Sequence, residues 1–283
     1  MSSKPQLNNS PAGAILLLVH LLCSLVERVF LTGRWIRQKF GILRRKNALV
    51  QGQPAKNGEY RSTQQFQLDS DSYISYGVRK LEKIPSHLVV MLGPEIADYE
   101  QLANFIFWGM AAGVGHVSFY DHRGTLKRNH HQMLHYVSKR PRGDSEQIVW
   151  TPQLKTSNGF LPPRNGYRSR VVVSFYSLED GKHRLASTAR TIASALRDGS
   201  ISAPAEVTIE MVNRKLQHRY HQVPDPELAV YFGNILSTYG MLPWQIRLTE
   251  FVRLDVGSLA ELNAGHFLKC LYQYAKCEQR FGK

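Results

Sequence analysis

The pattern Arg280-Phe281-Gly282 near the end of the 283-residue chain combines residue types that suit phosphate recognition. An arginine guanidinium presents a planar fork of donors that matches phosphate or carboxylate oxygens. A glycine lets a backbone N–H group approach a ligand closely, because it carries no Cβ. The pattern therefore predicts a phosphate-binding finger. A solvated arginine followed by a glycine that stops a helix fits the same residues, so the pattern alone leaves both interpretations open.

The segment before this pattern, residues 267–277, has the spacing of an amphipathic helix. Leu268, Leu271, Tyr272 and Ala275 recur at intervals that place them on one helical stripe. We therefore expect a packed helix that delivers the finger to a fixed position, in contrast to the frayed end that is usual for a chain terminus.

Other residue types that carry chemistry form no recognisable site. Cys23, Cys270 and Cys277 have no metal-binding spacing and make no even disulfide set, which indicates reduced thiols in a cytosol-facing domain. His131 and His135 can share a helical face, but the pair lacks a third ligand and the glutamate of the metalloprotease motif. We predict no metal site in this chain. The sequence also contains no P-loop, no dinucleotide fingerprint and no nucleophile elbow.

The basic charge of the chain is concentrated near its start. Formal net charge is +14, and residues 1–60 hold nine Lys and Arg against two Glu. Residues 12–31 are apolar over a length that suits a membrane-spanning helix, and a basic cluster from Arg34 to Lys46 follows them. The positive-inside rule then keeps the C-terminal side in the cytosol. We expect residues 1–46 to be a membrane anchor with a basic flank, with an interfacial amphipathic helix as the alternative. The remaining basic residues are scattered and match no nucleic-acid-binding signature, so we expect no nucleic-acid partner.

The rest of the chain reads as a linker and one domain. Residues 47–72 are polar and predict a flexible linker, and the folded domain is expected over 73–283. Strands are expected over 88–92, 116–120, 170–175 and 228–232, and helices over 98–112, from 126 onward, and over 184–197, 206–219 and 257–279. Residues 139–169 read as irregular. Continuous apolar strands that alternate with helices predict an α/β fold, with a mostly parallel central sheet, helices on both faces and an N-terminal membrane helix before it.

Several segments of this domain resemble the cis-prenyltransferases, the family of undecaprenyl diphosphate synthase. Pro85–Gly93 is similar to the first strand and phosphate-binding turn of that family, and His116–Asn129 to the second strand and its turn. Pro224–Leu228, Gly233 and Leu242–Glu250 resemble the late strand and its adjoining helix. Together with the ending Tyr274–Lys283, the pattern resembles the accessory subunits of dehydrodolichyl diphosphate synthase, the Nogo-B receptor family. The resemblance covers residues 73–283.

The chain departs from this family where catalysis would need it most. Competent members carry Asp before the glycine of the first turn, where it helps to hold magnesium and the allylic pyrophosphate; Leu92 stands there in this chain. A leucine cannot bind a hard cation, which takes oxygen ligands. Competent members also place Arg and Ser after the late strand, where this chain has Tyr231-Phe232-Gly233-Asn234. The turn Asp121–Gly124 differs from the family pattern too. The resemblance therefore implies a domain that is inactive alone.

The resemblance implies a subunit of a heteromeric cis-prenyltransferase at the endoplasmic reticulum membrane. Such a complex elongates farnesyl diphosphate with isopentenyl diphosphate to a long-chain polyprenyl diphosphate for dolichol synthesis and protein glycosylation. Arg280 and Gly282 would complete the active site of the catalytic partner, and Arg280, Phe281 and Gly282 would form the substrate-binding end. Mg²⁺ would be held mainly by that partner and by the substrate pyrophosphate. A membrane receptor or scaffold built on an inactive prenyltransferase fold is the alternative, and Leu92 disfavours a self-sufficient homodimeric enzyme.

Overall fold

The fold is described from a computed structural model, over residues 22, 25, 29, 32, 63–140, 146–151, 169–217, 223–233 and 237–278, with the side chains of 63–69 and 169 excepted. Most of the predicted anchor lies outside these residues, as do Arg280, Phe281 and Gly282. The chain divides into two compact units, residues 1–52 and 53–283, and every described strand belongs to the second.

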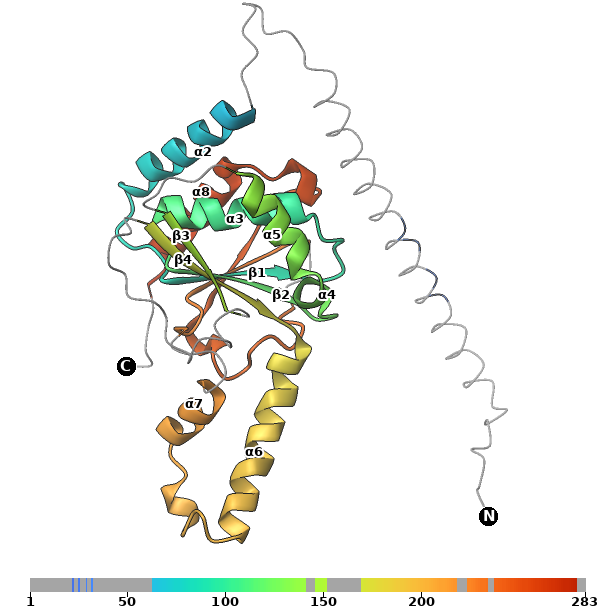
Figure 1. The fold of residues 1–283 in the computed structure, drawn as a ribbon, viewed down its shortest axis with the longest axis vertical. Helices are drawn as coiled ribbons and strands as arrows, with labels where there is room; N and C mark the ends of the chain where they lie inside the picture. The colour runs from blue at the N-terminus through green and yellow to red at the C-terminus, as the bar shows by residue number, and fades with distance from the viewer. Residues whose placement is uncertain are drawn as a thin grey trace, which may run out of the picture. The chain divides into compact units, whose positions relative to one another are not determined.

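The second unit is built around a parallel sheet of six strands (Figure 1). The strands are β1 (His87–Leu92), β2 (His116–Asp121), β3 (Glu146–Trp150), β4 (Ser169–Tyr176), β5 (Leu228–Tyr231) and β6 (Glu250–Arg253). Their order is β3-β4-β2-β1-β5-β6, and every neighbouring pair is parallel. Along the sheet, β2, β4 and β3 lie on one side of β1, whereas β5 and β6 lie on the other side of β1. The carboxyl ends of β1 and β5 therefore meet at the switch point where sheets of this kind bind ligands.

One face of the sheet carries the larger core. Helices α2 (Thr63–Val78), α3 (Tyr99–Ala112), α5 (His130–Lys139) and α8 (Ala264–Lys276) gather over this face in Figure 1. Alternate strand residues such as Leu88 and Val90 point into the core that these helices share. Phe105 of α3 packs edge-on against Phe267 of α8, with ring centroids 5.9 Å apart. Trp108 of α3 packs against the same ring at a tilt, with centroids 5.8 Å apart. Such aromatic contacts fix the two helices relative to each other.

The opposite face carries a smaller core. Val89, Met91 and Tyr120 from the strands pack there against Met241 and Leu242, which follow β5 in the chain. We expected helices over both faces. Within the described residues this second face is instead packed by the turn-rich segment 237–249, which contains the short 3₁₀ helix Ile246–Leu248.

Helices α6 (Lys182–Arg197) and α7 (Ile209–Gln217) form an arm that extends away from the sheet in Figure 1. Ile192 is buried, and the other side chains of α6 are solvent-exposed or half-buried. A short helix, α4 (Thr125–Arg128), joins the end of β2 to α5.

The structure confirms the parallel sheet and the four expected strands, and it adds elements that the sequence did not indicate. β3 lies inside 139–169, which we expected to be irregular, and β6 is a further strand. α2 begins at Thr63, ahead of Tyr73, where we expected the folded domain to start. The last helix begins at Ala264 rather than near 257, because Asn263 caps its first turn through Gly265 and His266. In the part of the chain that is described, no helix combines the length and apolar character that a membrane crossing requires.

Candidate functional site

The turn after β1 lies at the switch point of the sheet, and the protein's own side chains fill it. Leu92 is 2% exposed. The Tyr239 ring lies directly on Gly93, since a Cβ added to this glycine would stand 2.6 Å from the tyrosine hydroxyl oxygen. The close approach that a glycine permits is therefore taken by Tyr239 in this structure.

The Tyr239 ring is held in this position by two neighbours from β2 and its turn. It stacks on His122 with ring centroids 5.4 Å apart and an interplanar angle of 21°. The Tyr120 hydroxyl donates to the Tyr239 carbonyl oxygen over 2.6 Å. Burial, together with the carboxylates of Asp121 and Asp180, raises the pKa of Tyr120 to about 12, so the phenol stays protonated and keeps donating.

The carboxylates around this turn accept hydrogen bonds from the backbone and do not fit a magnesium ion. Asp121 is buried, and its two oxygens accept from the N–H groups of Arg123 and Leu126 over 2.8 and 3.0 Å. Glu95 accepts from the N–H group of Gly93 over 2.8 Å. Mg²⁺ demands oxygen ligands in near-octahedral geometry, and the described residues contain no cluster of three or more His, Cys, Asp or Glu that could hold a metal ion.

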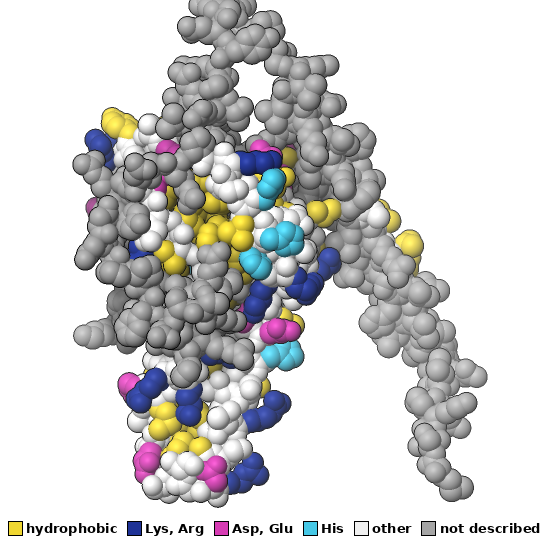
Figure 2. Space-filling view, in the orientation of Figure 1, with side chains coloured by type: hydrophobic (Ala, Val, Ile, Leu, Met, Phe, Trp, Pro, Cys, Tyr) yellow, Lys and Arg dark blue, Asp and Glu magenta, His cyan; other side chains and the backbone are white. Residues whose placement is uncertain are grey.

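A basic cavity of about 440 Å³ opens beside this turn, between the end of β2, α4 and the start of α6. Basic side chains dominate its lining, namely His122, Arg123, Lys127, Arg128 and His183, and Glu179 adds one carboxylate. Figure 2 shows Lys, Arg and His side chains gathered over α4, α5 and the start of α6. Lys127 is partly neutralised, because its ammonium group lies 2.7 Å from the buried carboxylate of Asp180. This carboxylate also accepts from the backbone N–H of Ser177 over 2.8 Å.

The C-terminal end of α8 is anchored at the opposite edge of the sheet, beside the amino ends of β1 and β5. Glu227, which directly precedes β5, accepts hydrogen bonds from the Tyr274 hydroxyl over 3.1 Å and from the Ser86 N–H over 2.7 Å. Lys83 donates to the Cys277 carbonyl oxygen and lies 4.9 Å above the Tyr274 ring centroid. Burial is the main cause that raises the pKa of Tyr274, and the nearby Glu227 carboxylate raises this pKa further. The last described residues of the chain therefore leave from this amino edge.

The predicted helix before the finger is confirmed as packed, although its buried stripe differs slightly from the expected one. Phe267, Leu268, Leu271 and Tyr274 are buried, whereas Tyr272 and Ala275 are half-buried. The predicted site residues Arg280, Phe281 and Gly282 lie outside the described residues, so their contacts stay a prediction.

The two histidines that lie four residues apart in the sequence are both exposed. His131 and His135 lie on α5, and the ring of His135 packs edge-on against Tyr136 at 5.7 Å. They belong to no metal cluster among the described side chains.

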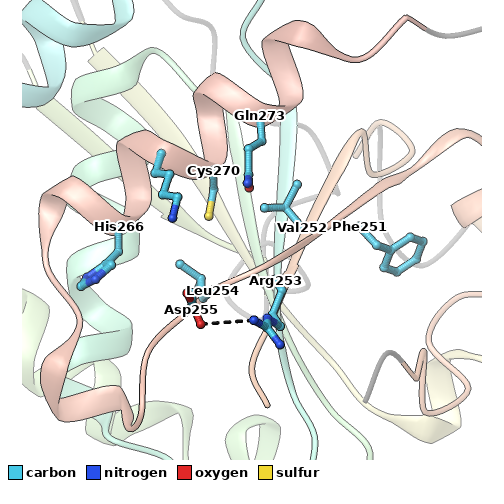
Figure 3. A pocket seen from close by; sticks show the side chains of 9 residues that line it. Phe251, Val252, Arg253, Leu254, Asp255, His266, Cys270 and Gln273 are labelled. Carbon is cyan, nitrogen blue, oxygen red and sulfur yellow. Dashed lines mark hydrogen bonds and ion pairs between the residues drawn. The ribbon is translucent and has the colours of Figure 1, made fainter. Parts of the chain in front are cut away.

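A second cavity, of about 430 Å³, lies between β6 and α8, and sequence reasoning did not find it (Figure 3). Arg253 on β6 pairs with Asp255 over 3.2 Å at its rim. Burial raises the pKa of the Cys270 thiol to about 12, so this cysteine stays protonated and is no nucleophile at neutral pH. Residues of β6 and α8 line this cavity. The sequence did not predict it, because β6 is too short for its hydrophobic pattern to identify a strand.

Comparisons with known proteins agree with this fold. No family model matches the chain. The chain is 31% identical over 208 residues to the mouse dehydrodolichyl diphosphate synthase complex subunit Nus1, covering 73% of this chain and 68% of that protein. It is 31% identical over 209 residues to the human NUS1 subunit, covering 72% and 69%. Among solved structures it resembles lavandulyl diphosphate synthase from Lavandula x intermedia, determined with dimethylallyl diphosphate, with a TM-score of 0.51 at 12% identity over 71% of this chain and 99% of that one. At that identity the last similarity concerns the fold alone.

Proposed function

This chain belongs to the family of NUS1 subunits of the dehydrodolichyl diphosphate synthase complex, and from this we propose that it is a subunit without prenyl transfer activity of its own. In our proposal it pairs with a catalytic cis-prenyltransferase subunit. The pair elongates farnesyl diphosphate with isopentenyl diphosphate to a long-chain polyprenyl diphosphate, the precursor of the dolichol used in protein glycosylation.

The observation that carries this proposal is the filled turn after β1. Leu92 supplies no oxygen for a cation, and the Tyr239 ring occupies the surface of Gly93 that a diphosphate would need. The nearby carboxylate of Asp121 is already bound to backbone N–H groups. Among the described residues, this turn offers neither an oxygen ligand at Leu92 nor an open surface at Gly93 for an allylic diphosphate with its metal, which supports a catalytic centre in another polypeptide.

The position of the α8 end supports the use of Arg280 and Gly282 in a partner. α8 ends beside the amino edge of the sheet, and Gly93 lies about 20 Å from that edge along β1, at about 3.3 Å per residue. α8 therefore ends at the edge of the sheet opposite the turn after β1, and this separation supports a phosphate-binding role of Arg280 and Gly282 at a site on another subunit.

In that site each residue of the finger has a distinct task. The Gly282 N–H would donate to a phosphate oxygen of isopentenyl diphosphate, and the Arg280 guanidinium would add a charge-assisted bond to the same group. Phe281 would pack beside them at the subunit interface. These contacts hold the homoallylic substrate next to the allylic one, which favours the reaction by positioning. Mg²⁺ would be held by the catalytic partner and the substrate pyrophosphate, since the residues at the β1 turn of this chain do not fit it.

We further propose that residues 12–31 anchor the subunit in the endoplasmic reticulum membrane, with the prenyltransferase-like domain in the cytosol. The described residues of this stretch support an apolar surface there, because Leu22, Leu25 and Val29 are 53, 60 and 63% exposed and recur at helical spacing. A hydrocarbon product must pass into lipid, and a membrane anchor shortens that path.

The proposal is tested by measuring the incorporation of labelled isopentenyl diphosphate. The full chain is assayed alone, with a catalytic cis-prenyltransferase homologue, and as Arg280→Ala and Gly282→Val variants of that pair. One charge-assisted hydrogen bond is worth roughly 1.5–3 kcal/mol. We therefore expect Arg280→Ala to lower turnover about tenfold to a hundredfold, and Gly282→Val to be as harmful because the backbone could no longer approach. Lys276→Ala, an exposed basic residue at the end of α8, is the matched control and should leave turnover unchanged.

Three outcomes separate the proposal from its alternatives. Stimulation of the partner that depends on Arg280 supports it. Transfer by this chain alone would contradict it and indicate a self-sufficient enzyme. Full activity of the pair after removal of Arg280–Lys283 would indicate the scaffold instead.

A further inference from the structure

The exposed face of α2 carries two tyrosines, and two basic residues follow directly after the helix. Tyr73 and Tyr76 are 53 and 63% exposed, and Arg79 and Lys80, in the turn after Val78, are also exposed. The spacing of three residues places the two tyrosines on one side of the helix axis. We refer to these four residues as the α2 patch. In Figure 2 hydrophobic and Lys or Arg side chains lie side by side at the upper left, over α2.

Large exposed hydrophobic side chains are few in this unit, which makes their grouping informative. From residue 63 onward, those that the structure describes are Tyr73, Tyr76, Tyr136, Ile209 and Leu248. Ile209 and Leu248 lie on separate elements, whereas two of the five share one turn of α2. A lone exposed apolar residue is normal on a protein surface, but neighbouring aromatic residues with cations mark an interaction surface.

The inward face of α2 fixes the direction in which the patch points. Gly77 lies so close to α8 that an added Cβ would stand 2.4 Å from Leu268 Cδ2. The Tyr272 hydroxyl of α8 donates to the Gly77 carbonyl oxygen over 3.3 Å, and Ser75 donates to the Ala111 carbonyl oxygen of α3 over 3.1 Å. These contacts prevent α2 from rotating about its axis, so the patch stays on the outer surface.

The charges of the patch favour an anionic partner. Residues 72–81 contain no carboxylate, the preceding Asp71 is paired with Arg140 of the α5 end, and the exposed Glu82 that follows is next to Lys83 in the chain. Lys80 Nζ lies 5.4 Å from the Tyr76 ring centroid, which places a cation at the edge of the aromatic surface. Tyrosine is enriched at membrane–water interfaces because its ring is apolar and its hydroxyl is polar. Lys and Arg beside it would attract anionic headgroups.

We propose that the α2 patch binds the anionic headgroup layer of the membrane, with the two tyrosine rings in the interface and Arg79 and Lys80 against lipid phosphate or carboxylate groups. This inference rests on the membrane attachment in the proposed function and adds a second contact, made by the folded domain itself. Attachment through the N-terminal segment alone would leave the orientation of the domain free. A headgroup contact through α2 would set which surfaces of the domain face the bilayer.

The test measures how close α2 comes to lipid in the full chain. The chain is reconstituted in phosphatidylcholine vesicles with or without about 30% phosphatidylserine, both containing a lipid with a nitroxide quencher near the headgroup. Trp35 is first replaced by Phe, since this indole lies next to the predicted anchor. Tyr76→Trp then reports on the patch, and Ile209→Trp on α7, 56% exposed in the parent residue, is the matched control.

We expect the added indole at position 76 to be quenched at least twofold more than the one at 209 when phosphatidylserine is present. Each removed charge should weaken the contact roughly fivefold, so Arg79→Gln with Lys80→Gln should bring the quenching at 76 down to the level at 209. Raised salt should act in the same direction.

Equal quenching at positions 76 and 209 in vesicles with phosphatidylserine would overturn the inference. Quenching at 76 that is indifferent to phosphatidylserine would also overturn it, and so would loss of this quenching on addition of the catalytic partner, which would identify a protein as the occupant. Flotation of the parent chain with vesicles tests the N-terminal anchor separately, and isopentenyl incorporation tests the proposed function. A failure of the α2 contact is therefore distinguishable from a failure of either.

Discussion

The buried imidazole of His87 should make this fold sensitive to acid, and its effect on stability can be worked out from its contacts. His87 is 1% exposed at the start of β1. Its Nδ1 lies 2.7 Å from the Pro224 carbonyl oxygen, which can only accept, so Nδ1 carries the proton and donates. Its Nε2 lies 2.7 Å from Ser118 Oγ and accepts from this hydroxyl. The ring is thus a fully bonded neutral tautomer.

Burial lowers the pKa of His87 to about 3, against the opposing effect of the Pro224 carbonyl. In the unfolded chain the pKa is about 6.5. Between these two values the unfolded state binds the proton and the folded state does not, so stability falls as the pH falls. The contribution of His87 is complete above about pH 6.5 and is lost at about 1.4 kcal/mol per pH unit down to about pH 3. At pH 5 the loss amounts to about 2 kcal/mol.

The assay compares the parent chain with His87→Gln, whose amide retains a polar group near Ser118 without a titrating ring. Urea unfolding of the full chain in a non-ionic detergent, followed by far-UV circular dichroism, gives the free energy of unfolding at each pH. We expect the variant to be less stable at pH 7, and the gap between the two proteins to narrow by about 2 kcal/mol at pH 5. Taking the difference cancels the titrating groups that lie away from His87. Two parallel stability curves from pH 7 to 5 would refute the reasoning.

Three further substitutions test the packing of the fold. Gly181→Ala would place a Cβ 2.0 Å from the Gly240 carbonyl oxygen, a backbone atom, so we expect a loss of more than about 3 kcal/mol in urea unfolding. Gly199→Ala is the control, because nothing lies within 4 Å of the added Cβ and only the backbone φ of +79° opposes the substitution. It should cost about 1 kcal/mol. Equal losses of stability at both positions would contradict a direct clash at Gly181. Tyr274→Phe removes one of two donors to Glu227 and should cost about 0.5–1.5 kcal/mol while loosening the α8 end, seen as faster amide hydrogen exchange there. Unchanged exchange would show that this hydrogen bond does not hold the helix end.

The elements that sequence reasoning predicted correctly are those whose pattern is local. β1 from Leu88 to Leu92 is a continuous apolar run, and β4 contains the apolar run Val171–Val173. Both strands are apolar because the sheet is covered on both faces at these positions. α3 shows a clear start at Asp98, which accepts from the Gln101 N–H, and a clear end at Gly113 with φ of 85°. Such signals need no knowledge of the rest of the chain.

The elements that it missed depend on distant partners. α2 has the polar composition of a linker, and its burial comes from Ile74 and Gly77 against α3 and α8, which follow much later in the chain. β6 has four residues and a single buried one, Val252, so neither run length nor alternation identifies it. It is a strand because β5 offers its edge.

By itself the sequence determined that the first turn carries Leu92 in place of a metal-binding carboxylate, and it predicted a phosphate-binding finger at Arg280 and Gly282, because these inferences depend on residue type alone. The tertiary structure alone decided what surrounds the first turn and where the helix before the finger ends. It placed Tyr239 on Gly93 and ended α8 at the amino edge of the sheet. Both depend on the order in which strands pair, and strand order is set by contacts between residues far apart in the chain, which no local periodicity records.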